Sequence, residues 1–367
     1  MAGQALDALP PTAHNSAFKA QSGASMSSSR VTIQDLADRL GLSKFSVSRA
    51  LSGKPGVGKA TRDRVLRAAH SMGYRVSQEF AQTNGQVLFI RQEVDPVSSE
   101  LWLNLLHGAE MEGERRGLSV VPRQARYLND PASIDSTVVG LILAVPYPAE
   151  LSGIAAKIGL PVVCAGYVGA LEPVDHVVGT DWEAGVAVGR FLMTRGHREI
   201  AFVHGNAKLL GRAERFRGLR DAMREVEGAT VHDIVFDESV GFREAFLAHL
   251  RAGSAPTALF CAHDGIAVNV ISELARLDVR VPEDVSVVGF NDFISASQVV
   301  PRLTTVRTPQ LELGAAMMRC IADRALNPDF RTVPPMRIAL VSELIEREST
   351  GPATSTKWRA RCLAAAG

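Results

Sequence analysis

Cysteine is scarce in this chain of 367 residues, and its four cysteines are widely scattered and expected to be ordinary reduced thiols. With no CxxC pair and no Cys/His cluster, neither a zinc site nor a disulfide framework is indicated. No apolar run approaches the roughly 18 residues that a membrane-spanning helix needs. The chain also lacks a GxSxG motif, a P-loop and a Rossmann glycine fingerprint, so we expect no enzymatic activity and no cofactor.

The first 30 residues lack the apolar middle segment of a secretory signal, which predicts a cytoplasmic protein that interacts with no membrane. Their Ala- and Ser-rich composition predicts a disordered extension, within which Met26 is an alternative start to Met1.

Net charge is close to balanced at +1, but the charge is unevenly distributed. Residues 30–75 contain ten Lys and Arg and three Asp, while the remainder of the chain is mildly acidic. A compact basic segment is typical of a protein that binds a polyanion at one end. Charge alone is equally consistent with a solvated surface.

Two short helices are predicted between residues 32 and 51. Thr32 is a suitable N-cap with Asp35 as its capping-box partner, and Gly41 ends the first helix. Ser43 caps a second helix that runs from Lys44 to about Leu51. Two helices joined by a tight turn that contains Gly form a helix-turn-helix, whose second helix fits the major groove of DNA.

Residues 31–75 closely resemble the DNA-binding head of the lactose-repressor (LacI/GalR) family. The shared pattern includes the TI-x-D-x-A opening, the GxS turn, the VSR-x-L recognition helix and the TR-x-RV third helix ending in GY. The resemblance implies that Lys44, Phe45 and Arg49 contact bases, with Arg49 suited to a bidentate contact with guanine. Phosphate contacts are expected from four hydroxyl side chains: Thr32, Ser43, Ser48 and Thr61.

Phe45 and the stretch after the head leave alternatives open. Phe45 either touches a thymine methyl group or packs beneath its helix. Family members commonly continue with a short hinge helix whose Leu wedges into the minor groove, but residues 76–85 contain no Leu, and Thr83 stands at the wedge position. Either Phe80 is a shifted wedge, or this protein bends DNA less.

From Gln86 onward, apolar strand patterns alternate with helical patterns. Strands are predicted at 87–90, 118–122, 138–145, 161–166, 200–205, 257–262 and 285–290, with a helix over 101–116. This alternation predicts an α/β fold, with doubly wound parallel sheets covered by helices on both faces. The segment is too long for one such sheet, so we expect two lobes with a ligand between them.

This second part resembles the family's periplasmic-binding-protein-like core, and the similarity extends from residue 31 to about 351. The resemblance implies a disordered extension (1–30), an all-α DNA-binding domain (31–75), a hinge (76–85), an effector-binding core (86–350) and a tail (351–367). Within the core it assigns 86–180 and 307–332 to an N-lobe, and 181–306 and 333–350 to a C-lobe.

The same resemblance suggests the residues that bind the effector. Arg215 stands where the family places its ligand-binding arginine, and Asn291 replaces an Asp that often pairs with sugar hydroxyls. Phe236 falls at the family's aromatic platform. The other candidates are Asp181, His263, Trp102 and Trp182. Each has an ordinary alternative as a core aromatic, a hydrogen-bonded His or a surface residue.

The sequence therefore predicts a transcription regulator, namely a repressor, that binds double-stranded operator DNA as a homodimer. A homodimer is expected because one head buries too little surface for specific binding. A small-molecule effector would switch its affinity for the operator, with a sugar or sugar derivative favoured and nucleobases left open. The alternative is a sugar-binding protein with no regulatory role on DNA, but such proteins are exported and carry no DNA-binding head.

Overall fold

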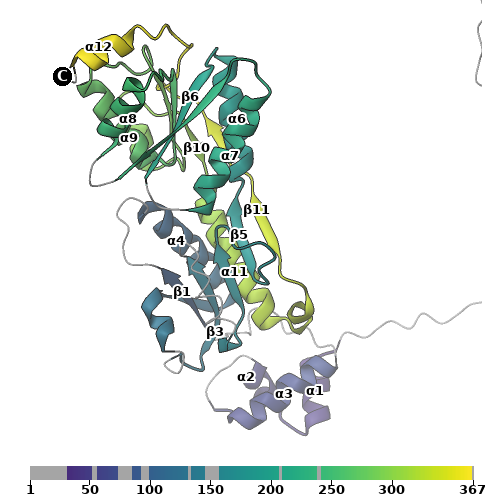
Figure 1. Cartoon of the computed structure of the whole chain (residues 1–367). Coiled ribbons are helices and arrows are strands. Elements are labelled where there is room, and N and C mark those ends of the chain that lie inside the picture. Colours follow the sequence, from purple (N-terminus) through teal and green to yellow (C-terminus); the bar gives the residue numbers. More distant parts are fainter. Residues whose placement is uncertain are drawn as a thin grey trace, which may run out of the picture. The chain divides into compact units, whose positions relative to one another are not determined.

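The computed structural model describes residues 31–51, 56–72, 85–91, 99–130, 134–144, 157–205, 209–237 and 241–365. The chain forms two compact units, Met1–Ala81 and Gln82–Gly367, which are described separately (Figure 1). Phe80 and the expected hinge up to residue 84 lie outside the described residues. Within the described part of the chain, no helix is long and apolar enough to cross a membrane.

The described part of the first unit contains three helices: α1 (Ile33–Leu40), α2 (Lys44–Leu51) and α3 (Lys59–Ser71). The predicted capping box at Thr32 and Asp35 is present, and Gly41 ends α1 in the left-handed conformation with φ 62°. The Ser43 hydroxyl accepts a hydrogen bond from the Ser46 amide at 3.0 Å, as expected of an N-cap. Leu36, Val47 and Val65 are fully buried at the centre of the three helices.

The second unit begins with a lobe built on a six-stranded parallel sheet, in the order β11-β5-β4-β3-β1-β2. Its strands are β1 (Gly85–Arg91), β2 (Leu118–Gln124), β3 (Val138–Ala144), β4 (Val162–Ala165), β5 (Asp175–Gly179) and β11 (Arg337–Leu340). Helices α4 (Ser99–Arg116) and α11 (Gln310–Leu326) pack together on one face of this sheet (Figure 1). Two short 3-10 helices, η2 (Ala125–Asn129) and η4 (Pro328–Thr332), complete the described part of the lobe.

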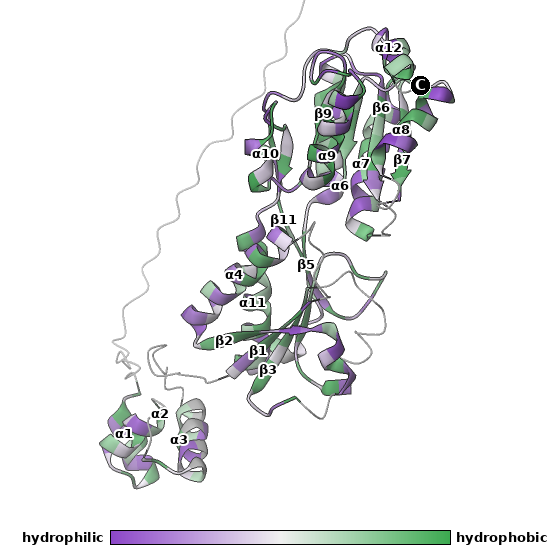
Figure 2. Cartoon of the chain, turned by 90° about the vertical axis from the view of Figure 1, so that its left-hand side faces the viewer, coloured by the Kyte–Doolittle hydropathy of each residue, from purple (hydrophilic) through white to green (hydrophobic). Residues whose placement is uncertain are grey.

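The second lobe is built on a four-stranded parallel sheet, in the order β7-β6-β8-β9. Its strands are β6 (Glu199–Gly205), β7 (Thr230–Phe236), β8 (Ala258–Cys261) and β9 (Ser286–Val288). Helices α6 (Asp181–Thr194) and α7 (Leu210–Arg224) cover one face, and α8 (Phe242–Arg251) and α9 (Asp264–Arg276) cover the other (Figure 1). The strands of both sheets are predominantly hydrophobic (Figure 2), so each lobe has its own core. The two-lobed α/β fold predicted from the sequence is confirmed.

Among the described residues, three segments connect the lobes, and one of them differs from expectation. The chain crosses between β5 and α6, between β10 (Thr305–Arg307) and α11, and between β11 and β12 (Glu343–Ile345). Residues 333–350 were expected in the C-lobe, but β11 pairs in parallel with β5 of the first sheet, so this assignment is wrong for Arg337–Leu340. Strand β12 instead pairs with β10, which lies beside the second sheet.

The C-terminal segment, expected to be a separate tail, is part of the second lobe. Helix α12 (Trp358–Ala365) places the Trp358 ring parallel to the Phe246 ring of α8, with their centroids 6.0 Å apart. Trp358 and Cys362 are fully buried, and the Arg359 guanidinium donates to the Leu250 carbonyl at the end of α8. This burial makes α12 a component of the second-lobe core.

Glycines allow two helix pairs to pack with their backbones in contact. A methyl group added to Gly108 of α4 would overlap the Leu311 carbonyl of α11, and one added to Gly314 would overlap the Leu105 carbonyl. The pair α6 and α7 repeats this arrangement, with Gly185 against the Arg215 carbonyl and Gly218 against the Trp182 carbonyl. Each pair therefore holds the residues one helical turn before its glycines close to the partner helix.

Candidate DNA and effector sites

The outer face of α2 presents the expected base-contacting side chains. Lys44 is exposed, Phe45 is 67% exposed, and Arg49 is half-buried with its guanidinium carbon 5.2 Å from the centre of the Phe45 ring. The opposite face buries Val47, Ala50 and Leu51. The exposure of Phe45 argues against the alternative in which it packs beneath the helix. Base contacts by Lys44, Phe45 and Arg49 remain predictions.

The four hydroxyl residues expected at phosphates lie at helix ends or on helix surfaces. Thr32 and Ser43 are exposed, and their side chains cap α1 and α2. Ser48 and Thr61 are half-buried on α2 and α3. Capping uses one lone pair of each Thr32 and Ser43 hydroxyl, which leaves a phosphate contact chemically possible. Their phosphate contacts also remain predictions.

Arg215 of α7 lies at the carboxyl-end side of the second sheet. Its Nε donates to Asp181 Oδ1 at 2.5 Å, and its NH1 group donates to the Ala262 carbonyl just after β8. Its guanidinium carbon lies 3.6 Å from the centre of the Phe290 ring, just after β9. Arg215 thus joins the first residue of α6 to the ends of two strands, where ligands bind in open parallel sheets.

Asp181 and Arg215 form a nearly buried ion pair, with side chains 9% and 14% exposed. Burial raises the pKa of the Asp181 carboxyl, although the adjacent Arg215 guanidinium opposes this shift. Burial and the nearby carboxylate of Asp181 also raise the pKa of Tyr167, a first-lobe residue whose hydroxyl lies 3.5 Å from the Gly179 carbonyl. Sequence reasoning placed Asp181 and Arg215 in the same site but did not identify their pairing, nor the roles of Phe290 and Tyr167.

Two other candidates have structural contacts of their own. His263 is buried and caps α9, with its Nδ1 accepting a hydrogen bond from the Ile266 amide at 3.2 Å. Phe236 ends β7 and packs in the second-lobe core, edge-on to Phe242 at a centroid distance of 6.4 Å. These contacts match the ordinary alternatives stated for both residues, and their effector roles remain predictions.

Asn291 is buried on the segment that leaves β9 toward the first lobe, and its backbone has a φ of 104°. Non-glycine residues rarely adopt this conformation, which persists only when surrounding contacts hold it. Its amide donates to the Val306 carbonyl at 2.7 Å, and its carbonyl accepts from Gln310 Nε2 at 2.9 Å. Neither Gln310 nor this backbone conformation was indicated by the sequence.

The two tryptophans differ in position. Trp182 belongs to the outer surface of the α6 and α7 pair, where its Nε1 donates to Asp221 at 2.9 Å and the Arg217 guanidinium carbon lies 5.8 Å from its ring. These contacts with α7 match the ordinary alternative of a surface residue, and an effector role for Trp182 remains a prediction. Trp102 is half-buried against the first-lobe core, and its role remains a prediction.

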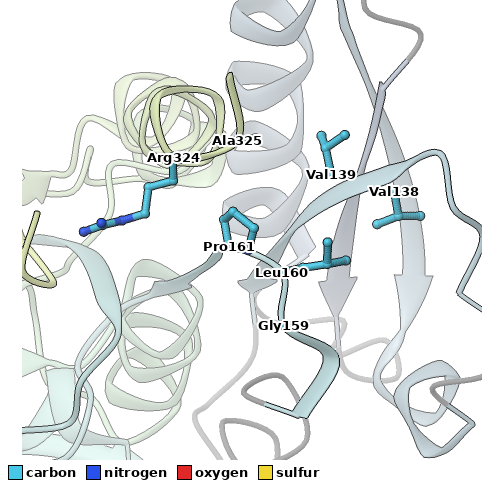
Figure 3. Close-up of a pocket in the computed structure, with 7 residues that line it drawn as sticks. All are labelled: Val138, Val139, Gly159, Leu160, Pro161, Arg324 and Ala325. Carbon is cyan, nitrogen blue, oxygen red and sulfur yellow. The ribbon is translucent and has the colours of Figure 1, made fainter. Parts of the chain in front are cut away.

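A hollow of about 550 Å³ lies elsewhere, in the first lobe (Figure 3). Its lining is Val138, Val139, Gly159, Leu160, Pro161, Arg324 and Ala325, and the Arg324 side chain extends away from the valines. Since β3 begins at Val138 and β4 follows Pro161, the hollow is at the amino ends of these strands. It is distinct from the residues gathered around Arg215. No group of three or more His, Cys, Asp or Glu side chains able to hold a metal occurs among the described residues.

Asp264, which follows His263 as the first residue of α9, is fully buried. Thr305 Oγ1 donates to its Oδ1 at 2.5 Å, and the Phe293 amide donates to its Oδ2 at 2.7 Å. Burial raises its pKa from 3.8 to about 7, although these hydrogen bonds oppose the shift. The folded state therefore retains a proton on Asp264 in a pH range where the unfolded state has lost it.

Replacing Asp264 by Asn should remove a pH-dependent part of the stability. In the native chain this contribution is fully present below pH 3.8 and is lost as the pH rises toward about 7. We expect the free energy of unfolding of the native chain, minus that of Asp264→Asn, to fall as the pH rises from 4 to 8. Urea unfolding of both proteins at each pH measures this difference, and parallel pH profiles would contradict the assignment.

Comparison with known proteins gives matches along most of the chain. Residues 32–77 match the model described as bacterial regulatory proteins, lacI family, and residues 190–350 match the periplasmic binding protein-like domain. The HTH-type transcriptional regulator DegA of Bacillus subtilis (strain 168) is 28% identical over 341 residues, covering 88% of this chain and 99% of DegA.

Solved structures match over a similar extent. The transcriptional regulator CelR in its cellobiose complex is 26% identical, with a TM-score of 0.64, covering 87% of this chain and 100% of that chain. The lac repressor dimer bound to operator and the anti-inducer ONPF has a TM-score of 0.64 at 20% identity, covering 88% of this chain and 99% of the repressor chain. The latter similarity shows the fold.

Proposed function

Because this chain belongs to the lacI family of bacterial regulatory proteins, we propose that it is a repressor that leaves its operator when a small, uncharged, hydroxylated molecule binds beside Arg215. It is a DNA-binding transcriptional regulator with an effector-binding domain. The proposal places it in the bacterial cytoplasm as a homodimer on a pseudo-palindromic operator, with no catalysed reaction.

The head supports the DNA part of the proposal. Helix α2 buries one apolar face and presents Lys44, Phe45 and Arg49 on the other. One such helix spans only a half-site, and a second copy supplies the other half-site in helix-turn-helix dimers. The lac repressor is bound to its operator as a dimer in the solved complex, which agrees with this arrangement.

The ion pair of Asp181 and Arg215 carries the proposal for the effector. Since the Arg215 charge is already opposed by a buried carboxylate, an anionic effector would have to compete with Asp181. A hydroxyl group can instead accept from the remaining Arg215 hydrogens and donate to a carboxylate oxygen. The pair therefore favours a neutral polyol, and CelR was solved with the neutral sugar cellobiose.

The proposed function is tested first by selecting binding sites from random DNA with the full chain. We expect a pseudo-palindromic sequence with two half-sites. A thermal-shift screen should then include cellobiose, ribose and other neutral sugars, with sugar phosphates and hypoxanthine as comparisons. A sugar at 100 times its Kd should stabilise the folded protein by about 2.7 kcal/mol and release the selected DNA.

Other results of this screen would overturn the proposal. Stabilisation by the sugar phosphate alone would show that the site prefers an anion, and stabilisation by hypoxanthine alone would assign a nucleobase. A ligand that tightens binding to the selected DNA would identify a corepressor in place of an inducer.

A further inference from the structure

We propose that Gln310, oriented by Asn104, is a positioning residue of the effector site that holds Asn291 and joins it to both first-lobe helices, α4 and α11. This inference rests on the proposed function in one respect, which is that Asn291 contacts the effector. The contact itself is shown by the hydrogen bonds of the Gln310 side chain with Asn104 and with the Asn291 carbonyl.

The direction of the hydrogen bonds is fixed by the Asn291 carbonyl, which can only accept. Gln310 must therefore turn its NH₂ group toward this carbonyl, as observed at 2.9 Å. Its oxygen then faces the other way and accepts from Asn104 Nδ2 at 2.8 Å. Asn104 thus stabilises the orientation in which the Gln310 NH₂ group reaches Asn291, and this contact matters because Asn291 has an unfavourable φ of 104°.

The packing of α4 against α11 explains why the two amides meet. Asn104 and Gln310 each stand one helical turn before the glycine at which the helices touch, Gly108 and Gly314. The same arrangement in the second lobe brings Asp181 and Arg215 together before Gly185 and Gly218. In each lobe, a close helix crossing therefore brings two polar side chains together. One member of each pair contacts the segment 290–291, Arg215 at the Phe290 ring and Gln310 at the Asn291 carbonyl.

Helix α4 also holds the far end of this segment. Glu100, one turn before Asn104, accepts from the Ile294 amide at 3.0 Å through Oε1 and at 3.3 Å through Oε2. Residues 291–294 are thus tied to α4 at both ends, directly by Glu100 and through Gln310 by Asn104. A displacement of Asn291 by an effector would be passed to α4 through these hydrogen bonds.

Hydrogen exchange of the full chain without ligand tests this inference, so its outcome does not depend on whether the proposed effector is correct. Gln310→Met keeps the length of the side chain but removes its hydrogen bonds with Asn104, Asn291 and Thr308. We expect the amides of residues 291–298 to exchange about tenfold faster, while those of β6 and β8 keep their native rates. Gln310→Lys is the matched control, because its amine can donate to the Asn291 carbonyl while the Asn104 amide rotates to accept.

Asn104→Asp supplies an independent variant with nearly unchanged shape. A carboxylate at this position would attract the Gln310 NH₂ group and turn its oxygen toward the Asn291 carbonyl, so exchange at 291–298 should again be about tenfold faster. If Gln310→Met does not fold, this variant decides the question. Native exchange rates in Asn104→Asp, or equally fast exchange in the Lys and Met variants, would overturn the inference.

Discussion

Replacing Arg215 by alanine is expected to lower the free energy of unfolding by about 3–5 kcal/mol, because the nearly buried Asp181 carboxylate would lose its counter-charge. The matched control is Arg217→Ala on the same helix. The Arg217 side chain is 59% exposed and pairs with Glu214 at the surface, so we expect a loss below about 1 kcal/mol. Urea unfolding at neutral pH measures both changes.

A second substitution separates the ion pair from the packing of the arginine. Asp181→Asn in the Arg215→Ala background removes the unpaired charge, and it should restore part of the lost free energy. Arg215→Ala should also fail to respond to any sugar that stabilises the native chain. An Arg215→Ala variant as stable as Arg217→Ala would show that the pair is not buried in solution.

The fold of the head could be predicted residue by residue because its signals are local. The Thr32 and Asp35 capping box and the left-handed Gly41 act within a single helical turn. The apolar strands of both lobes, such as β3 and β8, were likewise visible as short hydrophobic runs, because strands buried on both faces need few polar residues.

What the sequence did not indicate depends on contacts between distant residues. Strand β11 alternates exposed and half-buried residues, so it has no apolar run that assigns it to the first sheet. Helix α12 is fixed by the stacking of Trp358 on Phe246. The bond from Asn104 to Gln310 spans 206 positions, and neither amide belongs to a local motif.

In the candidate effector site, too, the sequence indicated single residues but not the contacts between them. Resemblance to a family suggested Arg215, Asp181 and Asn291 one at a time. The bond between Arg215 and Asp181 follows from the helix crossing at Gly185 and Gly218, and the bond between Asn291 and Gln310 joins the two lobes, both of which only the structure reveals. Trp182 likewise donates from its Nε1 to Asp221 of α7, a contact between two helices that the sequence did not indicate.

Replacing Arg49 by alanine should weaken binding to the selected operator by about 1–3 kcal/mol, a factor of roughly 5 to 150 in Kd, and relax the preference at one base pair. Arg49 lies on the outer face of α2 with its guanidinium near the exposed Phe45 ring, a position suited to the edge of a guanine.

Arg39→Ala, at the exposed end of α1, is the control and should affect all sequences alike. Binding titrations with the operator, with single-base variants and with random DNA at fixed salt distinguish the two effects. Equal losses for Arg49→Ala on operator and random DNA would assign Arg49 to a phosphate, and sequence recognition would then depend on Lys44 and Phe45.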